Sequence, residues 1–588
     1  MVLGDEQLGP YKSIWVCDTE YTATGGDLLV PICLSAKELR SGESINLWTG
    51  ELGKNPPFDT GEDNLFVAYN AAAELGFYLA LGWPLPRRVL DLYFEFRTLF
   101  NGDRKQLRFR LIDALEHYDI DSFGVEDKEA GQSLGMRGAP FTEWERAGLQ
   151  DYCRRDVAKT VELFERMWSA IRLDSALLRA RYAYAVAKVE REGVPIDYST
   201  FLALKENWDV IVRELIESVD TNYHVHENGV FSRKLFKAFV EGLGIRWPKT
   251  PTGIYRTDKE TFQRMAQALP HLKDLQELRR TMGQFKALKL TVGSDGRNRY
   301  NAVPYGASSG RNTPSATKAV FATAAWLRSL IKPREGEVFV YSDWHAQEWA
   351  IAAYLSKDPA MIADYESGDP YTELGKRWGL LKVSDTKKTA GEMRDRLKIC
   401  ALAVLYGLHA SGLADILQVT EHYAELLLEQ HHEMYWRFWR WVDFKMFRGR
   451  RKGRLETVFG FARKTYPRIT AKEWRSLSNF LVQGNGAECL RLSVCELTEA
   501  GYRVCAMVHD AIATLHQEET FEAELEVVQS TMRWASAQVL DGPEIGVEST
   551  IVRYPERYRD KRGVKLWGFT IQRLDSLQKQ LLLDKPCE

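Results

Sequence analysis

Two acidic residues near the start of the chain have the spacing of a metal-binding pair. Residues 13–18 (SIWVCD) form an apolar run typical of a buried strand, and Asp18 at its end is followed by Glu20. Because alternate residues of a strand point to the same face, the two carboxylates leave the strand together. They repel each other and lose hydration unless a divalent cation lies between them. Alone, such a pair is more typical of a solvated strand end.

Three residues further along the chain extend the pair to a set suited to phosphodiester hydrolysis. Glu74 lies in AYNAAAELGF, and residues 142–190 have helical periodicity, with Tyr152 and Asp156 near the start. Tyr152 and Asp156 are four residues apart and share a helix face. In two-metal hydrolysis, acids hold the ions, one ion activates water, the other stabilises the leaving oxygen, and a tyrosine can orient the water. We therefore predict two Mg²⁺ ions, with Mn²⁺ as a substitute, held by Asp18, Glu20, Glu74 and Asp156, with Tyr152 beside them.

Another pair of aspartates lies far away in the sequence, each at the end of an apolar segment. Asp343 closes the strand-like run EVFVYSDW at 337–344, and Asp510 lies at the turn of the hairpin-like segment 502–515. Either aspartate alone is more typical of a turn. On neighbouring strand ends, the two carboxylates would hold two Mg²⁺ ions roughly 3.5–4 Å apart, as phosphoryl transfer requires.

The segment RDRLKICALAVLYG places four residues at successive i+4 positions: Arg394, Lys398, Leu402 and Tyr406. They form one stripe of two cations, an apolar residue and an aromatic residue on a predicted helix. An amphipathic helix with basic side chains reaching into water would give the same spacing. In the functional interpretation, arginine grips the outer phosphates of a triphosphate, lysine neutralises the inner phosphate, and the base packs on the apolar end.

Taken in order along the chain, these motifs resemble those of the family A, DNA polymerase I-like DNA polymerases. DWHAQEWAIAA, RDRLKICALAVLYG and VHDAI resemble the three polymerase motifs, and the N-terminal set resembles a DEDD-type 3′→5′ exonuclease with a tyrosine in its third motif. The resemblance covers nearly the whole chain. It implies template-directed DNA synthesis with proofreading, in an enzyme without a 5′-nuclease domain that we interpret as encoded by a bacteriophage.

The resemblance also assigns roles to single residues. Asp343 and Asp510 would be metal ligands, Glu348 the steric gate that selects the sugar, and Lys398 a catalytic cation. The dNTP would be bound by Arg394, Lys398, Leu402, Tyr406, Glu348 and Tyr371. The DNA would be contacted by Arg311, Arg475, Asn479, Gln483 and His509.

Several positions depart from the usual family pattern. Leu402 stands where an aromatic residue is usual, Tyr371 where histidine is common, and Ala511 where a glutamate normally follows the catalytic aspartate. In the exonuclease set, Glu74 replaces an aspartate and Ala73 replaces an aromatic residue. We expect a divergent nucleotide pocket. Asp91 is interpreted as the cap of a strand end rather than as a further metal ligand.

The predicted fold class is α/β plus α+β in several domains, with a ribonuclease H-like exonuclease domain followed by a right-hand polymerase. The exonuclease domain is predicted at 1–175 and the polymerase domain at 176–588. Within the latter, the thumb is expected at about 190–300, the palm at about 301–365 and 456–588, and the fingers at about 366–455.

Composition limits the class of protein without defining its function. The chain has 588 residues and a net charge of −2, and its eight cysteines include no CxxC pair, which is typical of reduced cytosolic thiols. No membrane span or secretory signal is expected, so we predict a bacterial-cytoplasmic monomer. Its predicted partners are primer–template DNA, dNTPs and replication accessory proteins. Basic clusters at 387–398 and 446–454 are local surfaces for DNA, although most charge runs are only solvated faces.

Two other functions remain open at this point. A 3′→5′ exonuclease could keep a weakened polymerase half as a DNA-binding platform. Retention of Asp343, Asp510, Arg394 and Lys398 argues against decay, since unpaired metal-binding acids have no structural use. A single-subunit RNA polymerase would share the palm chemistry, but Glu348 should clash with a 2′-hydroxyl.

Overall fold

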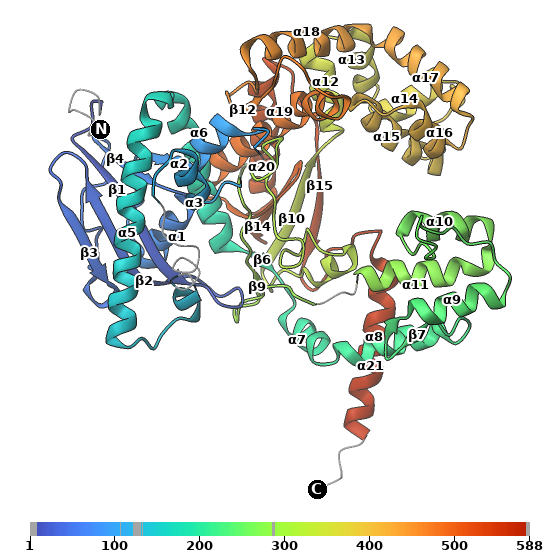
Figure 1. Ribbon diagram of the computed structural model, residues 1–588, viewed down its shortest axis with the longest axis horizontal. Coiled ribbons are helices and arrows are strands. Elements are labelled where there is room, and N and C mark those ends of the chain that lie inside the picture. Colours follow the sequence, from blue (N-terminus) through green and yellow to red (C-terminus); the bar gives the residue numbers. More distant parts are fainter. Residues whose placement is uncertain (1–8, 106–107, 122–130, 132, 285–287, 584–588) are drawn as a thin grey trace. The chain divides into compact units, whose positions relative to one another are not determined.

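The computed structural model describes all residues except 1–8, 106–107, 122–130, 132, 285–287 and 584–588. It divides into two compact units (Figure 1). Unit 1 contains Met1–Gly193, Asn301–Thr313 and Gly336–Ile551, and unit 2 contains Val194–Tyr300, Pro314–Glu335 and Val552–Glu588. These units cut across the domain boundaries that we predict from the sequence.

The N-terminal part of unit 1 is built on a five-stranded sheet of order β3-β2-β1-β4-β5. Its strands are β1 (Ser13–Thr22), β2 (Val30–Glu38), β3 (Ser44–Trp48), β4 (Asn64–Ala68) and β5 (Val89–Asp91). β1 is parallel to β4 and antiparallel to β2. The strand expected at 13–18 is confirmed as part of β1, which continues to Thr22, so Asp18 lies inside the strand and not at its end. Buried residues such as Ile14, Leu65 and Leu90 form the core of this sheet.

Helices surround this sheet and continue towards the second half of the unit. They are α1 (Ala72–Leu81), α2 (Leu92–Phe100), α3 (Leu111–His117), α5 (Glu143–Met167) and α6 (Leu173–Glu192). The periodic segment at 142–190 is therefore two helices, separated by a short 3₁₀ turn at Trp168–Ala170. Helical periodicity alone does not reveal this break, since apolar residues continue on both sides of it.

A four-stranded sheet of order β13-β14-β10-β15 forms the centre of the C-terminal part of unit 1. The strands are β10 (Glu337–Trp344), β13 (Arg503–Val508), β14 (Ala511–Gln517) and β15 (Val547–Arg553). β14 is antiparallel to both β10 and β13, so the strand at 337–344 and the hairpin at 502–515 are confirmed. A separate short hairpin is formed by β11 (Arg454–Glu456) and β12 (Ala462–Lys464).

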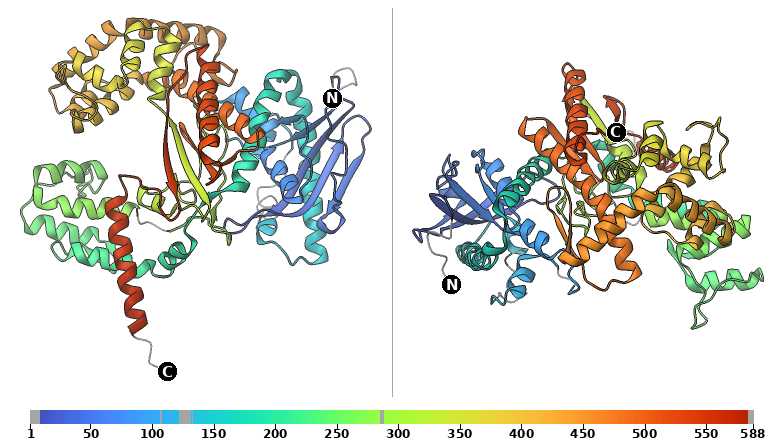
Figure 2. Two further views of the ribbon diagram at one scale, coloured as in Figure 1. Left: turned by 180° about the vertical axis from the view of Figure 1, so that it is seen from behind. Right: turned by 90° about the horizontal axis from the view of Figure 1, so that it is seen from above.

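Nine helices of the described chain accompany this second sheet in unit 1, and Figure 2 shows them from two further directions. They are α12 (Gln347–Ser356), α13 (Pro359–Glu366), α14 (Pro370–Arg377), α15 (Gly391–Leu405), α16 (Ala410–Leu417), α17 (Glu421–Met434), α18 (Trp436–Lys452), α19 (Ala471–Glu499) and α20 (Phe521–Leu540). The longest, α19, is buried along most of its length and forms part of the core.

Unit 2 is mainly helical and has a core of its own around Phe236, Trp247 and Phe262. Its helices are α7 (Tyr198–Glu206), α8 (Trp208–Asp220), α9 (Arg233–Gly242), α10 (Lys259–Ala268), α11 (Lys273–Gln284) and α21 (Val564–Leu583). Its strand pairs are short: β6 (Val194–Pro195) with β9 (Arg297–Asn298), and β7 (His226–Glu227) with β8 (Val230–Phe231). None of the described helices has an apolar stretch long enough to cross a membrane.

Candidate functional site

The structure brings the two distant aspartates of the C-terminal half together. Asp343 lies near the end of β10, directly opposite Ala511 of β14, and Asp510 occupies the turn before that strand. The Trp344 amide donates a hydrogen bond of 3.3 Å to the Asp510 carbonyl oxygen, which fixes the two strand ends side by side. We call Asp343 and Asp510 the palm pair.

The palm pair is held in a desolvated and repulsive environment. Burial raises the pKa of the Asp343 carboxyl, the Asp510 charge raises it further, and Lys398 acts in the opposite direction. Burial also raises the pKa of Asp510, against the nearby charge of Arg311. Asp343 Oδ1 is buried and accepts no hydrogen bond from any described residue. Two such carboxylates suit a hard divalent cation, which relieves both the repulsion and the lost hydration.

No three Asp, Glu, His or Cys side chains among the described residues already converge on one metal position. The palm pair therefore supplies two carboxylates rather than a closed cage. This number is characteristic of Mg²⁺ sites in which a substrate phosphate completes the coordination, whereas an all-protein cage would need more ligands.

Several residues that we predict to bind DNA or the dNTP lie around the carboxylate of Glu348. Glu348 Oε1 accepts hydrogen bonds from Arg311 Nη2 at 2.8 Å and from Gln483 Nε2 at 3.2 Å. Burial and the Glu348 charge raise the pKa of the Tyr406 hydroxyl, which places the ring near the same carboxylate. Residues from a loop, α12, the end of α15 and α19 therefore meet at Glu348.

The predicted stripe on α15 adjoins the buried face of that helix. Leu397, Ala401 and Val404 are buried, whereas Lys398 is exposed and Arg394 and Leu402 are half-buried beside them. The ring of Tyr371 lies beneath both cations, 5.4 Å from the Arg394 guanidinium and 5.7 Å from Lys398 Nζ. Because Lys398 stays exposed next to the buried face, the stripe is open to a ligand along part of its length.

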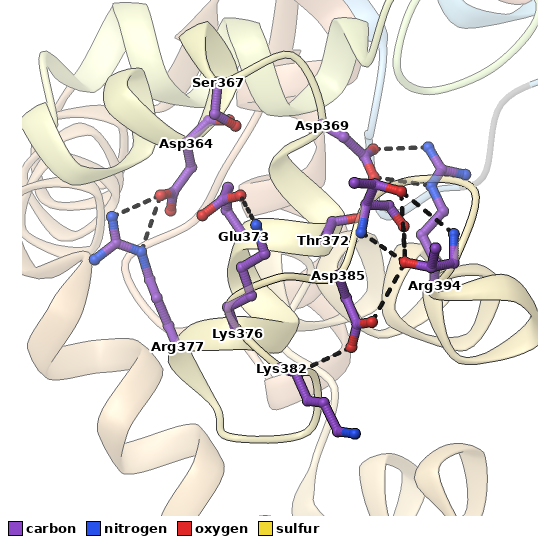
Figure 3. A network of polar contacts seen from close by, with 12 residues as sticks. Asp364, Ser367, Asp369, Thr372, Glu373, Lys376, Arg377, Lys382, Asp385 and Arg394 are labelled. Carbon is purple, nitrogen blue, oxygen red and sulfur yellow. Dashed lines mark hydrogen bonds and ion pairs between the residues drawn. The ribbon is translucent and has the colours of Figure 1, made fainter.

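Arg394 is already engaged by an acidic partner that the sequence did not reveal. Its Nη2 and Nε atoms donate to the two oxygens of Asp369, at 2.8 and 3.0 Å, as Figure 3 shows. Burial would raise the pKa of Asp369, but hydrogen bonds from Arg394 and Thr372 outweigh it and the pKa is lowered. The guanidinium is thereby fixed in one orientation, with its ion pair mostly shielded from water.

Helix α19 carries the predicted template residues beside a cavity of about 340 Å³. Arg475 packs against Gly407, where a Cβ atom would lie 3.0 Å from the arginine Cγ and where φ is +77°. The cavity is lined by the end of α15, by α17 and α18, and by the start of α19. Asn479 Oδ1 is buried one turn further along α19, with no hydrogen-bond partner in the described chain. His509 is exposed at the turn that carries Asp510.

The N-terminal carboxylates also face one another. Burial raises the pKa of Glu20, and the charges of Asp18, Asp156 and Glu74 raise it further. Burial and the Asp18 charge likewise raise the pKa of Glu74, whose Oε2 atom is buried and has no hydrogen-bond partner in the described chain. Strand β1, α1 and α5 thus bring four acids near enough for their charges to raise one another's pKa, although no three described side chains converge on one metal position.

Two neighbours of this acidic set complete its description. The pKa of Tyr152 is raised by burial and by the charges of Asp156 and Glu20, so the ring adjoins the set as predicted. Asp91 caps α2 by accepting hydrogen bonds from the amides of Tyr93 and Phe94. It also accepts from the Ala71 amide at 2.9 Å, directly before the helix that carries Glu74. The interpretation of Asp91 as a cap is confirmed.

Comparison with known proteins decides the family. The sequence profile of DNA polymerase family A matches residues 203–548, which is more than half of the chain. The chain belongs to DNA polymerase family A. The resemblance inferred from its motifs is confirmed at that level, and the matched range includes Arg311, Asp343, Lys398 and Asp510 but none of the N-terminal carboxylates.

Similar proteins of family A come from distant bacteria. The chain is 26% identical to DNA polymerase I of Aquifex aeolicus over 399 residues, 64% of this chain and 66% of that protein. It is 23% identical to DNA polymerase I of Streptococcus pneumoniae over 363 residues, 56% of this chain and 40% of that protein. For the thermostable DNA polymerase I of Thermus thermophilus, identity is 25% over 406 residues, 64% and 47% of the two chains. The matches thus span between 40% and 66% of these relatives.

A solved structure shows the same fold over nearly the whole chain. It is the POL domain of Pol1 from M. smegmatis in complex with DNA primer–template and dNTP. The TM-score is 0.70 at 18% sequence identity, and the match covers 93% of this chain and 96% of that one. The family A polymerase fold, with mixed helices and sheets, is therefore present here.

One connection in this family A chain was not foreseen from its sequence. Helix α2 of the N-terminal part grips the loop 304–308, which precedes Arg311. Arg97 Nη2 donates to the carbonyl oxygens of residues 305, 306 and 307, and Asn101 Nδ2 donates to the Ser308 carbonyl at 3.0 Å. The Tyr93 hydroxyl donates to the Pro304 carbonyl at 3.0 Å. We call these contacts the α2 brace.

The α2 brace holds a loop whose backbone is locally unfavourable. Val303 and Tyr305 have φ values of 38° and 55°, in the left-handed region that side chains disfavour. Such conformations persist only where surrounding contacts impose them. Tyr305 is fully buried between the rings of Phe94 and Phe461, and Arg491 lies over its face. The position of Arg311 therefore depends on elements far away in the sequence.

Proposed function

We propose that this chain is a template-directed DNA polymerase that extends a primer 3′ end with dNTPs by two-metal phosphoryl transfer. The observation that carries the proposal is the palm pair, two buried carboxylates on adjacent strand ends with Lys398 near Asp343. The names of the relatives, each a DNA polymerase I, support it. So does the ligand set of the fold neighbour, which was solved with primer–template and dNTP.

In the proposed reaction, the primer 3′-hydroxyl attacks the α-phosphate of the dNTP in line with the leaving pyrophosphate. Asp343 and Asp510 would hold two Mg²⁺ ions, which when bound would activate that hydroxyl and stabilise the leaving pyrophosphate. Lys398 Nζ neutralises the triphosphate and donates a proton to the pyrophosphate. Arg394 takes the outer phosphates with the two nitrogens that now contact Asp369. Leu402 and Tyr406 offer the base an apolar surface.

The proposed DNA contacts surround Glu348. Arg311 and His509 meet the primer strand, while Arg475, Asn479 and Gln483 line the template and the minor groove. Glu348 packs against the sugar and excludes a 2′-hydroxyl, and Tyr371 lies at the outer phosphates below Arg394 and Lys398. The fingers (about 366–455) close over a correct base pair. The palm is proposed at about 301–365 and 456–588, and the thumb at about 190–300.

The N-terminal part, residues 1–175, is proposed to be a 3′→5′ exonuclease that removes misfitted primer ends. Its supporting observation is the mutual repulsion of Asp18, Glu20, Glu74 and Asp156, a donor set that favours divalent cations. Tyr152 adjoins Asp156 and would orient the attacking water. Glutamate at position 74 is one methylene longer than the usual aspartate, so this activity is the more sensitive of the two to metal identity.

The polymerase proposal is tested by extension of a labelled primer on a longer template with Mg²⁺ and dNTPs. Asp510→Asn keeps the shape of the side chain but removes its charge, and we expect extension to fall on the order of 10³-fold. Glu519→Gln, at an exposed position after β14, serves as the matched control and should extend normally. Shortening of the primer without any extension by wild type would instead support an exonuclease with a DNA-binding platform.

The exonuclease proposal is tested by shortening of a mismatched primer without dNTPs. Asp156→Asn should abolish shortening and leave extension unchanged. Asp151→Asn is the control on the same helix, because Asp151 is half-exposed and pairs only with Arg154 and Arg155 among the described residues. If Asp156→Asn shortened the primer at the wild-type rate, these carboxylates would not form an exonuclease site. A bacteriophage origin, replication accessory proteins, a cytoplasmic location and the monomeric state stay predictions.

A further inference from the structure

Helix α18 presents one face that combines aromatic and basic side chains. Its buried residues Phe438, Val442 and Met446 anchor the helix, which is labelled in Figure 1. At 3.6 residues per turn, six exposed residues share about one third of the helix circumference on the opposite side. We call them the α18 face: Trp436, Arg440, Phe444, Phe447, Arg448 and Arg451.

The aromatic residues of the α18 face are unusually open to solvent. The exposed fractions of Trp436, Phe444 and Phe447 are 50%, 53% and 59%. Arg448 lies over the Phe444 ring at 5.5 Å and Arg451 over the Phe447 ring at 5.8 Å. Exposure of several large aromatic rings to water is unfavourable, and such patches mark binding surfaces. Rings that alternate with cations are complementary to a ligand with flat aromatic faces and negative charge.

Charge around this face is strongly positive. Helix α18 contains seven basic residues and one acidic residue, although the chain as a whole has a net charge of −2. Partial burial and the charges of Arg448 and Lys452 lower the pKa of Lys445, as expected for neighbouring cations that are not neutralised. An anionic ligand would relieve this repulsion.

Single-stranded DNA satisfies both requirements at once. Its bases stack on aromatic side chains while its phosphates pair with cations, without any need for a specific sequence. Duplex DNA would use the cations only, since its bases are stacked inside. The α18 face extends from residue 436 to residue 451, about 22 Å at 1.5 Å per residue, which matches roughly six stacked bases at 3.4 Å each.

The location of α18 indicates which single strand is meant. Trp439, on the adjoining flank of the same helix, lines the 340 Å³ cavity together with Gly407 and Arg475. This cavity lies beside the proposed template residues, so a strand that passes it reaches α18 next. We propose that the α18 face binds the unpaired template strand ahead of the point of synthesis. The inference rests on the proposed polymerase function and names a further surface for its template.

The test is equilibrium binding of labelled primer–templates that differ only in the length of the 5′ template overhang. Fluorescence anisotropy is measured without dNTPs, on wild type and on the double variant Phe444→Ala/Phe447→Ala. We expect wild type to bind a twelve-nucleotide overhang about tenfold more tightly than a two-nucleotide overhang, and the variant to lose this difference. Arg448→Gln/Arg451→Gln should reduce the slope of log affinity against log salt by about 1.4 for the long overhang.

Controls separate this surface from the rest of the protein. Trp144→Ala, at a ring that is 83% exposed on α5, should keep the overhang dependence. All variants should keep the wild-type melting temperature, which reports that they fold, and should bind the two-nucleotide overhang nearly as wild type does. An overhang dependence retained by both double variants would overturn the inference, as would tighter competition by a polyglutamate peptide than by oligo-dT. If wild type failed to extend any primer, the polymerase proposal would be refuted, whereas the dependence of binding on overhang length would stand on its own measurement.

Discussion

The palm pair and the N-terminal carboxylates are both buried acids that repel one another, but their surroundings differ. Near the palm pair, Lys398 and Arg311 oppose the rise in carboxylate pKa. Around Glu20 and Glu74, the charges that shift the pKa are all acidic. The polymerase region thus supplies part of the compensating charge from its own side chains. In the proposed exonuclease, the N-terminal region would need that compensation from cations in solution.

Removal of the Lys398 charge should have the largest effect, because it takes away part of the positive charge that distinguishes the palm pair from the N-terminal carboxylates. Lys398→Ala should lower kcat for single-nucleotide addition by about 10²–10³-fold and leave primer shortening intact, because only the palm site uses this charge. The measurement is pre-steady-state incorporation beside an exonuclease assay. Arg396→Ala, on the same helix outside the stripe, is the control and should be nearly silent. Equal loss of both activities would show that Lys398 acts through folding.

A second prediction concerns Glu348, the acid beside the palm pair, which is proposed to pack against the sugar and not to bind metal. Glu348→Ala should reduce discrimination between dNTP and rNTP at least tenfold, or about 1.4 kcal/mol, because the side chain that meets the sugar is gone. Glu348→Gln keeps the volume and can still meet Gln483, so it should keep most of the discrimination. If the glutamine variant lost as much as the alanine variant, charge rather than size would select the sugar.

The smallest expected effect concerns stability in the N-terminal region without metal. The pKa values of Glu20 and Glu74 lie above the ordinary 4.5 in the folded protein. Above pH 4.5 the folded state therefore holds protons that the unfolded state has released, and stability decreases as pH rises. Glu74→Gln removes one such group. In metal-free buffer it should melt a few degrees above wild type at neutral pH, and the gap should close towards pH 4.5.

Divalent metal should reverse that order. A metal concentration of 100 times the dissociation constant increases the free energy of unfolding by about 2.7 kcal/mol. We expect a larger increase for wild type than for Glu74→Gln, which lacks one of the carboxylates. Differential scanning fluorimetry with and without Mg²⁺ measures both effects. Glu62→Gln, at an exposed position, should follow wild type in each buffer. A variant that melted below wild type in metal-free buffer would show that Glu74 is stabilised by contacts other than metal.

The sequence predicted those parts of the site that carry a local signal. Asp343 and Asp510 lie where apolar strands end, and Asp18 and Glu20 lie two residues apart within one strand. The i+4 spacing on α15 predicts that its stripe shares one side of the helix, since alternation and helical period follow from backbone geometry. The ion pair of Asp369 with Arg394 was not predicted, because an aspartate before a helix is an ordinary cap signal. Arg97 was missed for a similar reason. Its three acceptors lie 208–210 residues away and are backbone carbonyls, which no residue type reveals.

The α2 brace has a practical consequence for the design of a form of this protein that lacks the proposed exonuclease activity. Cutting the chain before α6 would delete Tyr93, Arg97 and Asn101, and with them the hydrogen bonds on the loop before Arg311. The shortened protein should bind its primer weakly, because the loop before Arg311 would no longer be held in position. A point substitution at the proposed exonuclease site, such as Asp156→Asn, keeps the N-terminal region in place as a scaffold, so this variant should retain full extension.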